Sequence, residues 1–385
     1  MAKYGSKEHK ELVFDSASLE EAYKGAGDKG EGIQIWRVKN IKRTDLKAAK
    51  FGIIKVNVNE YCIITEFVPT YQSRKVPEEE YGSFFSGDSY IILQTYMVET
   101  KKYFNLFFWL GRESSQDEIG TAAYKTVELD TLLGSTPVQH RELDGKESAK
   151  FLKLFKSFKV LKGGFESGFT KVKREEYKPR LYHLRGAKKE TIVCREVECK
   201  VDSMNEGDAF ILDAGLSIFI FHGKSSGIWE KRRALDIVSG IKSEVGRGKA
   251  KKIFVDTEST DKEFWDTLGG KSEVPDALPS DEKTAPKPKV SKCELWKLSE
   301  ETGTIKLTKV SDKPKKSDVH NKDVFLLDLG NEVLVHVGSK CSTQERYESI
   351  GVAIRYLKAN KLDLTTPITR YIEGGDCTGF TSHLA

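Results

Sequence analysis

Three stretches of the chain share one pattern: GDSYIIL…FFWLGRESSQDE (residues 87–118), GDAFILD…IFIFHGKSSGIWE (207–230) and KDVFLLD…VLVHVGSKCSTQE (322–345). Each stretch predicts a strand, a second strand that ends at a glycine, and then a helix. A repeat of this kind indicates tandem units of one fold. In each stretch an aspartate opens the first strand, and a glutamate stands seven residues after the glycine: Asp88, Gly111 and Glu118, then Asp208, Gly223 and Glu230, then Asp323, Gly338 and Glu345.

The elements around each stretch predict one architecture per unit. A strand precedes it, at residues 32–38, 180–186 and 293–299, and a final strand follows its long helix. This order predicts an α+β fold (an α/β sandwich) of three tandem domains, each with a mixed five-stranded sheet between a long and a short helix. The predicted division is an N-terminal lead-in (1–30), domain 1 (31–168, with an insert at about 40–76), domain 2 (169–270), a proline-rich linker (271–292) and domain 3 (293–385).

The recurring carboxylates predict a cation site in each unit. An aspartate at a strand start and a glutamate at a helix start supply the oxygen ligands that a hard cation such as calcium prefers. For a single unit, the simpler interpretation is an aspartate that caps a turn and a glutamate that fills the first helical turn. Because the pair recurs three times in register, we favour metal binding, with Ca2+ as the cofactor.

Composition indicates a cytoplasmic protein. The chain holds six cysteines without CxxC spacing, which is typical of free thiols in a reducing compartment. We find no apolar run long enough to span a bilayer and no apolar core of signal-peptide length at the start, so a transmembrane segment or secretion is not expected.

Positive charge is concentrated in one part of the chain. The net charge is +5, but residues 150–189 contain 13 Lys or Arg against three Glu. Such a patch attracts phosphoinositide headgroups, nucleic acid or an acidic protein.

Several strings along the chain resemble signatures of the gelsolin family, in the family's order. They are GIQIWRV, SGDSYIIL, FFWLG, SSQDE, GTAAYKTVELD, PVQHRE, KGGFESGF and EYKPRLYH, and the resemblance extends from about residue 31 to the C-terminus. Within this family, the strings resemble most specifically the short, three-domain severin and fragmin branch. The resemblance implies a protein that is not an enzyme, is activated by calcium, severs actin filaments and caps their barbed ends. The insert at about 40–76 departs from the family pattern, as does Lys322, which stands where a glycine or a similar residue is usual.

The resemblance implies a calcium ligand set for each domain. Some of these ligands are backbone carbonyls, so Lys322 can serve in spite of its side chain. The implied ligands are Gly87, Asp88, Glu118 and Phe165 in domain 1, Gly207, Asp208, Glu230 and Asp281 in domain 2, and Lys322, Asp323 and Glu345 in domain 3.

The helix predicted over residues 115–133 carries an unusual acid. At about 100° per residue, Asp130 lies about 20° from Ile119 on a largely apolar face. A carboxylate there is disfavoured by desolvation and by the helix dipole, unless a cation bridges it to a partner. The resemblance implies a calcium shared between Asp130 and actin, with help from the carbonyls of Ser135 and Pro137. The alternative is a solvated aspartate at a helix end.

Two further surfaces follow from the resemblance and from the basic runs. The helix is expected to enter a groove on actin, while the second domain grips the filament side. The predicted actin contacts are Ile119, Ala123, Tyr124, Val127, Lys171, Lys173, Arg174, Arg180, Lys231, Arg232 and Arg233. The predicted phosphoinositide contacts, for which a solvated basic face is the alternative, are Lys156, Lys159, Lys162, Arg180, Arg185, Lys188 and Lys189.

We therefore predict a calcium-dependent severing and barbed-end capping protein of the actin cytoskeleton that polyphosphoinositides inhibit and that is monomeric when free. One alternative is a module that caps filaments or binds actin monomers without severing. A metal-dependent phosphoesterase is a second alternative, but it needs several carboxylates around one open metal position. Here one pair stands in each repeat, which argues against it.

Overall fold

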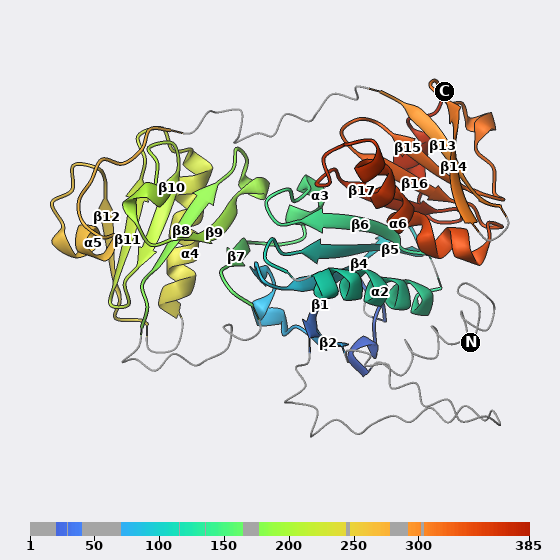
Figure 1. Ribbon diagram of the computed structural model, residues 1–385. Helices are drawn as coiled ribbons and strands as arrows, with labels where there is room; N and C mark the ends of the chain where they lie inside the picture. The colour runs from blue at the N-terminus through green and yellow to red at the C-terminus, as the bar shows by residue number, and fades with distance from the viewer. Residues whose placement is uncertain are drawn as a thin grey trace, which may run out of the picture.

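The computed structural model describes residues 21–28, 30–40, 71–114, 116–134, 136–164, 177–243, 247–277, 292–301 and 304–385. Three sets of elements with the same order follow one another along the chain, and we call them the first, second and third repeats. Figure 1 shows the first repeat in the middle, with the second on one side and the third on the other.

The first repeat contains the most elements. After the short helical turn η1 (Glu21–Tyr23) come β1 (Gly32–Asn40), β2 (Tyr71–Lys75), η3 (Glu78–Glu80), β3 (Ser83–Phe85), β4 (Ser89–Val98), β5 (Lys101–Leu110), α2 (Gln116–Leu132), β6 (Val138–Leu143), α3 (Ala149–Leu152) and β7 (Phe158–Leu161).

The other two repeats are shorter. The second contains β8 (Arg180–Arg185), η5 (Lys189–Thr191), β9 (Val193–Val197), η6 (Val201–Ser203), β10 (Ala209–Asp213), β11 (Ser217–His222), α4 (Ile228–Ser243), β12 (Lys251–Val255) and α5 (Lys262–Thr267). The third contains β13 (Glu294–Glu301), β14 (Thr304–Ser311), η8 (Lys316–Asp318), β15 (Val324–Asp328), β16 (Val333–Val337), α6 (Thr343–Ala359), β17 (Ile368–Ile372) and α7 (Thr378–Thr381).

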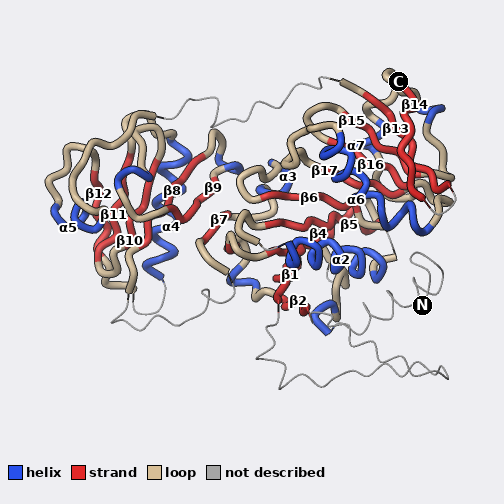
Figure 2. Tube along the Cα trace, in the orientation of Figure 1, coloured by secondary structure: helices blue, strands red, loops and turns tan. Residues whose placement is uncertain are grey.

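Five strands of each repeat form a mixed sheet, as the sequence predicts, but the sheets of neighbouring repeats are joined. The first and third repeats share a ten-stranded sheet of order β14-β13-β15-β16-β17-β6-β5-β4-β1-β2. Its two halves meet where β17 pairs antiparallel with β6. Figure 2 shows the strands of the two halves following one another across this meeting point.

The second sheet joins the first and second repeats. Its order is β12-β11-β10-β8-β9-β7-β3, so two short strands of the first repeat extend the five strands of the second. Here β7 pairs with β9, and the two strands are parallel. The sequence pattern did not predict either junction, because strand periodicity carries no information about which strands meet at an edge.

The repeated glycine has the same steric reason in all three repeats. A Cβ on Gly111 would lie 2.3 Å from the Ser86 carbonyl oxygen, and the other two glycines are equally crowded by backbone. Each glycine N–H also donates to the carbonyl of its repeat's aspartate: Gly111 to Asp88 (3.0 Å), Gly223 to Asp208 (3.0 Å) and Gly338 to Asp323 (3.1 Å). The glycine thus fixes the second strand's end against the aspartate at the start of the first.

Each sheet is packed on both faces. In the first repeat, one core lies on the side of α2 and contains Trp36 and Leu129, while the other contains Phe107 and Phe151 and lies on the side of α3. The second and third repeats have the same two cores, with the long helices α4 and α6 on one face and the short helices α5 and α7 on the other. The predicted sheet between a long and a short helix is confirmed.

Most of the predicted insert lies outside the described residues. Its last part forms β2, which pairs antiparallel with β1 at the edge of the ten-stranded sheet. The predicted lead-in is described only from Glu21, where Tyr23 packs on Trp36 with ring centroids 5.6 Å apart. The five cysteines in the described part of the chain are free thiols.

Candidate functional site

The three repeated aspartates all contact basic side chains. Asp88 is buried and forms an ion pair and a hydrogen bond with Arg37 of β1. Asp208 is completely buried and lies 2.8 Å from His183 Nε2 and 3.6 Å from an Arg185 nitrogen. Asp323 is more accessible, and it contacts the Lys297 and His320 side chains at 3.5 and 3.2 Å.

The repeated glutamates begin the long helices. Glu230 is completely buried, and its carboxylate accepts hydrogen bonds from the N–H groups of Gly227 (2.7 Å) and Gly186 (3.1 Å). Glu345 accepts from the Ser342 N–H, while the Ser342 hydroxyl accepts from the Glu345 N–H. The contacts with Gly227 and Ser342 cap the helices, and the Gly186 contact ties the start of α4 to the end of β8. They give the glutamates a structural role that holds whether or not they also bind a metal. Glu118 lies in α2, but its side chain is outside the described residues.

The chemistry of these residues fits calcium. Asp208 and Glu230 are both buried carboxylates, and the chain that leads into the linker passes beside them, since the Glu206 N–H donates to the Pro275 carbonyl. A Cβ on Gly207 would lie 2.9 Å from Ala277, so this segment is close enough to contribute oxygens. Within the part of the chain that the structure describes, however, no group of three or more His, Cys, Asp or Glu side chains converges as a metal site would require. Phe165 and Asp281 lie outside that part.

Asp130, the acid predicted to share calcium with actin, is buried rather than solvated. The solvated alternative is therefore wrong for this arrangement of the chain. An Arg370 nitrogen of β17 lies 3.4 Å from its Oδ2. Burial raises the pKa of Asp130, and the Arg370 charge opposes that rise. Arg370 is itself buried, and it also donates to the Ser349 hydroxyl and to the Arg346 carbonyl. The third repeat thus covers this acid of the first.

The helix α2 is otherwise placed as predicted on the first repeat. Val127 is half-buried, and Pro137, which follows the helix, is buried. From the third repeat, Ile350 of α6 packs against the core on the α2 side. The predicted contacts Ile119, Ala123 and Tyr124 lie on α2, but their side chains are outside the described residues, as is Ser135.

The structure brings the two basic runs together. Arg233 of α4 donates to the Lys156 carbonyl at 2.6 Å and to the Lys189 carbonyl at 3.1 Å. Lys156, Lys162, Lys188 and Lys189 are exposed, and Lys159, Arg180 and Arg185 are half-buried. Of the predicted filament contacts in the second repeat, Arg232 is exposed and Lys231 is half-buried, and Lys171, Lys173 and Arg174 lie outside the described residues.

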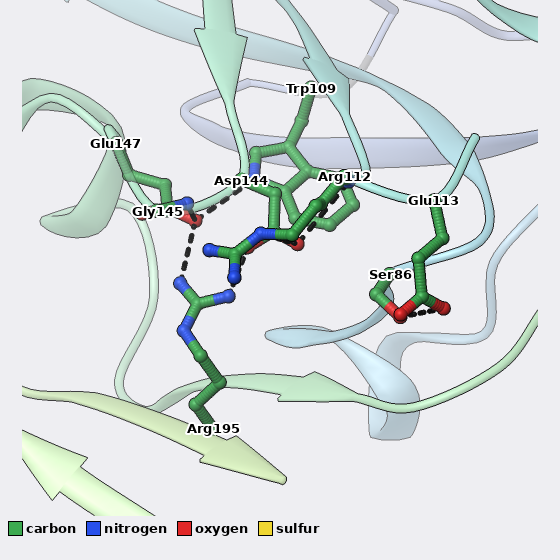
Figure 3. A network of polar contacts seen from close by, with 8 residues as sticks. All are labelled: Ser86, Trp109, Arg112, Glu113, Asp144, Gly145, Glu147 and Arg195. Carbon is green, nitrogen blue, oxygen red and sulfur yellow. Dashed lines mark hydrogen bonds and ion pairs between the residues drawn. The ribbon is translucent and has the colours of Figure 1, made fainter. Parts of the chain in front are cut away.

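A polar network at the junction of the first and second repeats carries no predicted site residue. Arg195 of β9 forms ion pairs with Asp144 and Glu147, which follow β6 (Figure 3). Glu147 also accepts from the Trp109 indole at 3.3 Å, and Asp144 accepts from the Arg112 N–H at 3.3 Å. Both acids are almost completely buried, so Arg195 supplies the charge that balances them.

Sequence reasoning missed Arg370 and Arg37. Arg370 is separated from Asp130 by 240 residues, so no local pattern connects them. Arg37 could have been found from the sequence, because a basic residue follows the aromatic residue of the first strand in every repeat. These pairs are Trp36-Arg37, Tyr182-His183 and Trp296-Lys297.

Comparison with known proteins identifies the family. The gelsolin repeat model matches residues 72–152 and 190–260. The chain is 38% identical over 370 residues to "Actin depolymerising venom protein gelsolin 1" of Platymeris rhadamanthus, which covers 93% of this chain and 89% of that protein. It is 37% identical over 391 residues to "Gelsolin-like protein 2" of Lumbricus terrestris, covering 100% of this chain and 95% of that one. It is also 39% identical over 346 residues to "Gelsolin-like protein 1" of the same species, covering 88% and 83%.

The chain therefore belongs to the gelsolin family of actin-severing proteins. Members of this family are regulators that bind actin and not enzymes, which removes the phosphoesterase alternative. In the described part of the chain, no helix has both the length and the apolar character needed to cross a membrane.

Proposed function

We propose that this protein severs actin filaments and caps their barbed ends in a calcium-dependent manner. The observation that carries this proposal is the ion pair between Asp130 and Arg370, which keeps a predicted actin-binding acid buried between two repeats. A buried carboxylate on the helix expected to enter actin cannot reach a partner until β17 separates from β6. In this proposal, the described arrangement is the inactive one, and activity requires the first and third repeats to separate.

In this proposal, activation must break two contacts between the first and third repeats. Arg370 holds Asp130 by charge, and Ile350 of α6 packs against the core beneath α2. Parting of the repeats exposes α2 for insertion into an apolar groove, while Lys231 and Arg232 of α4 are available for an acidic filament surface. Calcium, when bound by the repeated carboxylates, supplies the positive charge that biases this equilibrium through different affinities for the two arrangements.

We also propose that polyphosphoinositides inhibit the protein at the joined basic runs. Arg233 fixes the Lys156 and Lys189 backbones to one helix, which supports a single anion-binding surface of residues 156–162 and 180–189. The same surface borders the second repeat's predicted filament contacts, so lipid and actin would compete for it. A cytoplasmic location, a monomeric free state and the division into three domains at residues 31–168, 169–270 and 293–385 complete the proposal.

The first prediction tests calcium dependence. Pyrene-labelled actin filaments should depolymerise rapidly with nanomolar protein and calcium, and slowly when calcium is chelated. Asp130→Asn should weaken calcium-dependent binding of actin monomers about tenfold or more, since the neutral amide binds a cation poorly. Asp236→Asn, an exposed position on α4, is the matched control and should behave as wild type. Capping without a rise in the number of filament ends would favour the alternative of a capping module.

The second prediction tests lipid inhibition. Replacing Lys156, Lys159 and Lys162 with Ala should weaken co-sedimentation with phosphatidylinositol bisphosphate vesicles about a hundredfold, at roughly 1 kcal/mol for each basic residue near an anionic surface. Changing Lys313, Lys315 and Lys316 to Ala removes the same charge from exposed positions of the third repeat and should have little effect. Equal losses in the two triple variants would mean that only net charge matters and that these runs form no specific surface.

A further inference from the structure

The basic residues at the repeated aspartates occupy the same register in all three repeats. Arg37 of β1 pairs across the strands with Tyr90, His183 of β8 with Phe210, and Lys297 of β13 with Phe325. Each of these aromatic residues stands two positions after the aspartate of its repeat. Residues two apart on a strand share a face, so the basic side chain and the aspartate lie on the same side of the sheet as diagonal neighbours.

The aromatic neighbours help to orient two of these side chains. The Arg37 guanidinium carbon lies 4.7 Å from the centroid of the Phe85 ring and 5.8 Å from that of Tyr90. The His183 ring stacks on Phe210 with centroids 4.6 Å apart. A cation held against an aromatic face loses little further freedom when it pairs with an acid. The first strand of these repeats is thus built to deliver a basic group to the aspartate.

The pairs differ in how far water reaches them. In the first repeat, the Arg37 and Asp88 side chains are 8% and 2% exposed. In the third repeat, the Lys297 and Asp323 side chains are 37% and 19% exposed, and their charged atoms are 3.5 Å apart. Breaking a buried ion pair is far more unfavourable than breaking a solvated one. Water can take the place of the lost partner at an exposed group, but it cannot reach a buried group. In the second repeat, Asp208 is shared between His183, Arg185 and the Asn205 amide.

We infer that Arg37 and Lys297 are internal counterions that hold the calcium-binding aspartates in the calcium-free protein, so that calcium binds in exchange for these contacts. In the second repeat, His183 and Arg185 together contact the aspartate. The inference rests on the proposed calcium dependence and adds a regulatory element to it. An ion pair that must break before calcium binds lowers the apparent calcium affinity of that site. The decrease is set by the free energy of the ion pair. The first-repeat site, with the buried Arg37 pair, therefore requires a higher calcium concentration than the third-repeat site.

The exchange gives the chain graded calcium sensing without different ligand sets. The Asp–Glu pair recurs at the same places in each repeat, so this pair alone does not distinguish the repeats. The basic residue varies between Arg, His and Lys, and so does its burial. Substitution at this one position would tune each threshold while the carboxylates stay unchanged.

The experiment measures calcium affinity directly, by calorimetry on the full chain without actin. Asp88→Asn first identifies the binding step that belongs to the first repeat. Arg37→Gln, which keeps a hydrogen-bond donor but removes the charge, should then tighten that step about tenfold or more and lower the melting temperature of the calcium-free protein. Lys297→Gln should tighten the third-repeat step by about threefold or less. Lys153→Gln removes the same charge from an exposed position of the first repeat and should change neither step.

The outcomes of this experiment distinguish failure of the counterion inference from failure of the proposed calcium dependence. If the wild type binds calcium and Arg37→Gln binds it equally or more weakly, Arg37 only positions Asp88 and the inference is wrong while the proposed function stands. If the wild type shows no calcium binding at millimolar concentrations, the proposed calcium dependence fails and the inference fails with it. Should Arg37→Gln not fold, Arg37→Lys keeps the charge but loses the planar contact to Phe85 and should give an intermediate gain in affinity. Wild-type calcium affinity in Arg37→Lys would then overturn the inference.

Discussion

The first repeat meets its two neighbours in the same manner, by adding a strand to a sheet, yet the two junctions cover different chemistry. The β6–β17 junction is antiparallel and buries Asp130 against Arg370. The β7–β9 junction is parallel and buries two acids against Arg195, none of which belongs to a predicted site. In the proposed function, the β6–β17 junction covers a predicted actin-binding residue and must open, while the β7–β9 junction can stay closed.

The repeat pattern sharpens this contrast. β6, β12 and β17 are the strands that follow the long helix in the three repeats, and each is parallel to the strand before it. β6 and β17 pair with each other, whereas β12 lies at the end of its sheet. In the described part of the chain, the equivalent strands therefore pair with each other only between the first and third repeats. The exposed Lys251 and Lys252 of β12 are typical of an edge protected from pairing.

The largest effect is expected from breaking the ion pair at the β6–β17 junction. Arg370→Gln leaves the Asp130 carboxylate buried without a counter-charge, which should destabilise the joined arrangement by about 3–5 kcal/mol at pH 7.5. Small-angle X-ray scattering should show a larger radius of gyration in the absence of calcium, and actin monomers should bind without calcium. Arg355→Gln, at an exposed ion pair of the same helix–sheet unit, is the control and should leave both measurements unchanged.

The matching change at the other junction should behave differently. Arg195→Gln removes the partner of Asp144 and Glu147, but its side chain is 22% exposed, so water replaces part of the lost interaction. We expect a loss of about 2 kcal/mol in the free energy of unfolding, without any actin binding in the absence of calcium. If Arg195→Gln activated the protein as strongly as Arg370→Gln, the two junctions would not differ in function.

The sequence predicted what depends on local pattern and on repetition. The strand, glycine turn and long helix of each repeat lie where the pattern indicated, because steric crowding at Gly111 and its equivalents fixes the same geometry three times. The sequence placed Asp130 on the apolar face of the long helix, but its burial against the third repeat was not predicted. The partner of Asp130 and the pairing of β6 with β17 could not be predicted, since both depend on contacts between residues more than 200 positions apart. The basic residues at the aspartates were predictable in principle, because they recur at one position of the repeat.

A buried histidine makes the β6–β17 junction sensitive to protons. His140 of β6 pairs in register with Thr369 of β17, and its ring stacks on Phe107 with centroids 4.6 Å apart. Its Nε2 lies 3.2 Å from the Asn105 amide oxygen and 3.3 Å from the Lys150 ammonium. Burial lowers the pKa of His140 well below 6.5, and the Lys150 charge lowers it further. His140 is therefore neutral in the folded protein at pH values where it is protonated in the unfolded chain.

The smallest expected effect is the pH dependence that follows from this shift. Above about pH 6.5, His140 is neutral in both states and contributes no dependence. As the pH falls below that value, the unfolded chain takes up a proton that the folded chain does not, so the wild type should lose stability. Between pH 7.5 and 5.5, the free energy of unfolding should fall by about 1 kcal/mol more for wild type than for His140→Gln. Burial raises the pKa of the nearby Glu142 to about 7, which favours the folded state in the same range, but both proteins share this contribution and it cancels in the difference. Parallel denaturant-unfolding profiles for the two proteins would show that folding does not lower the pKa of His140.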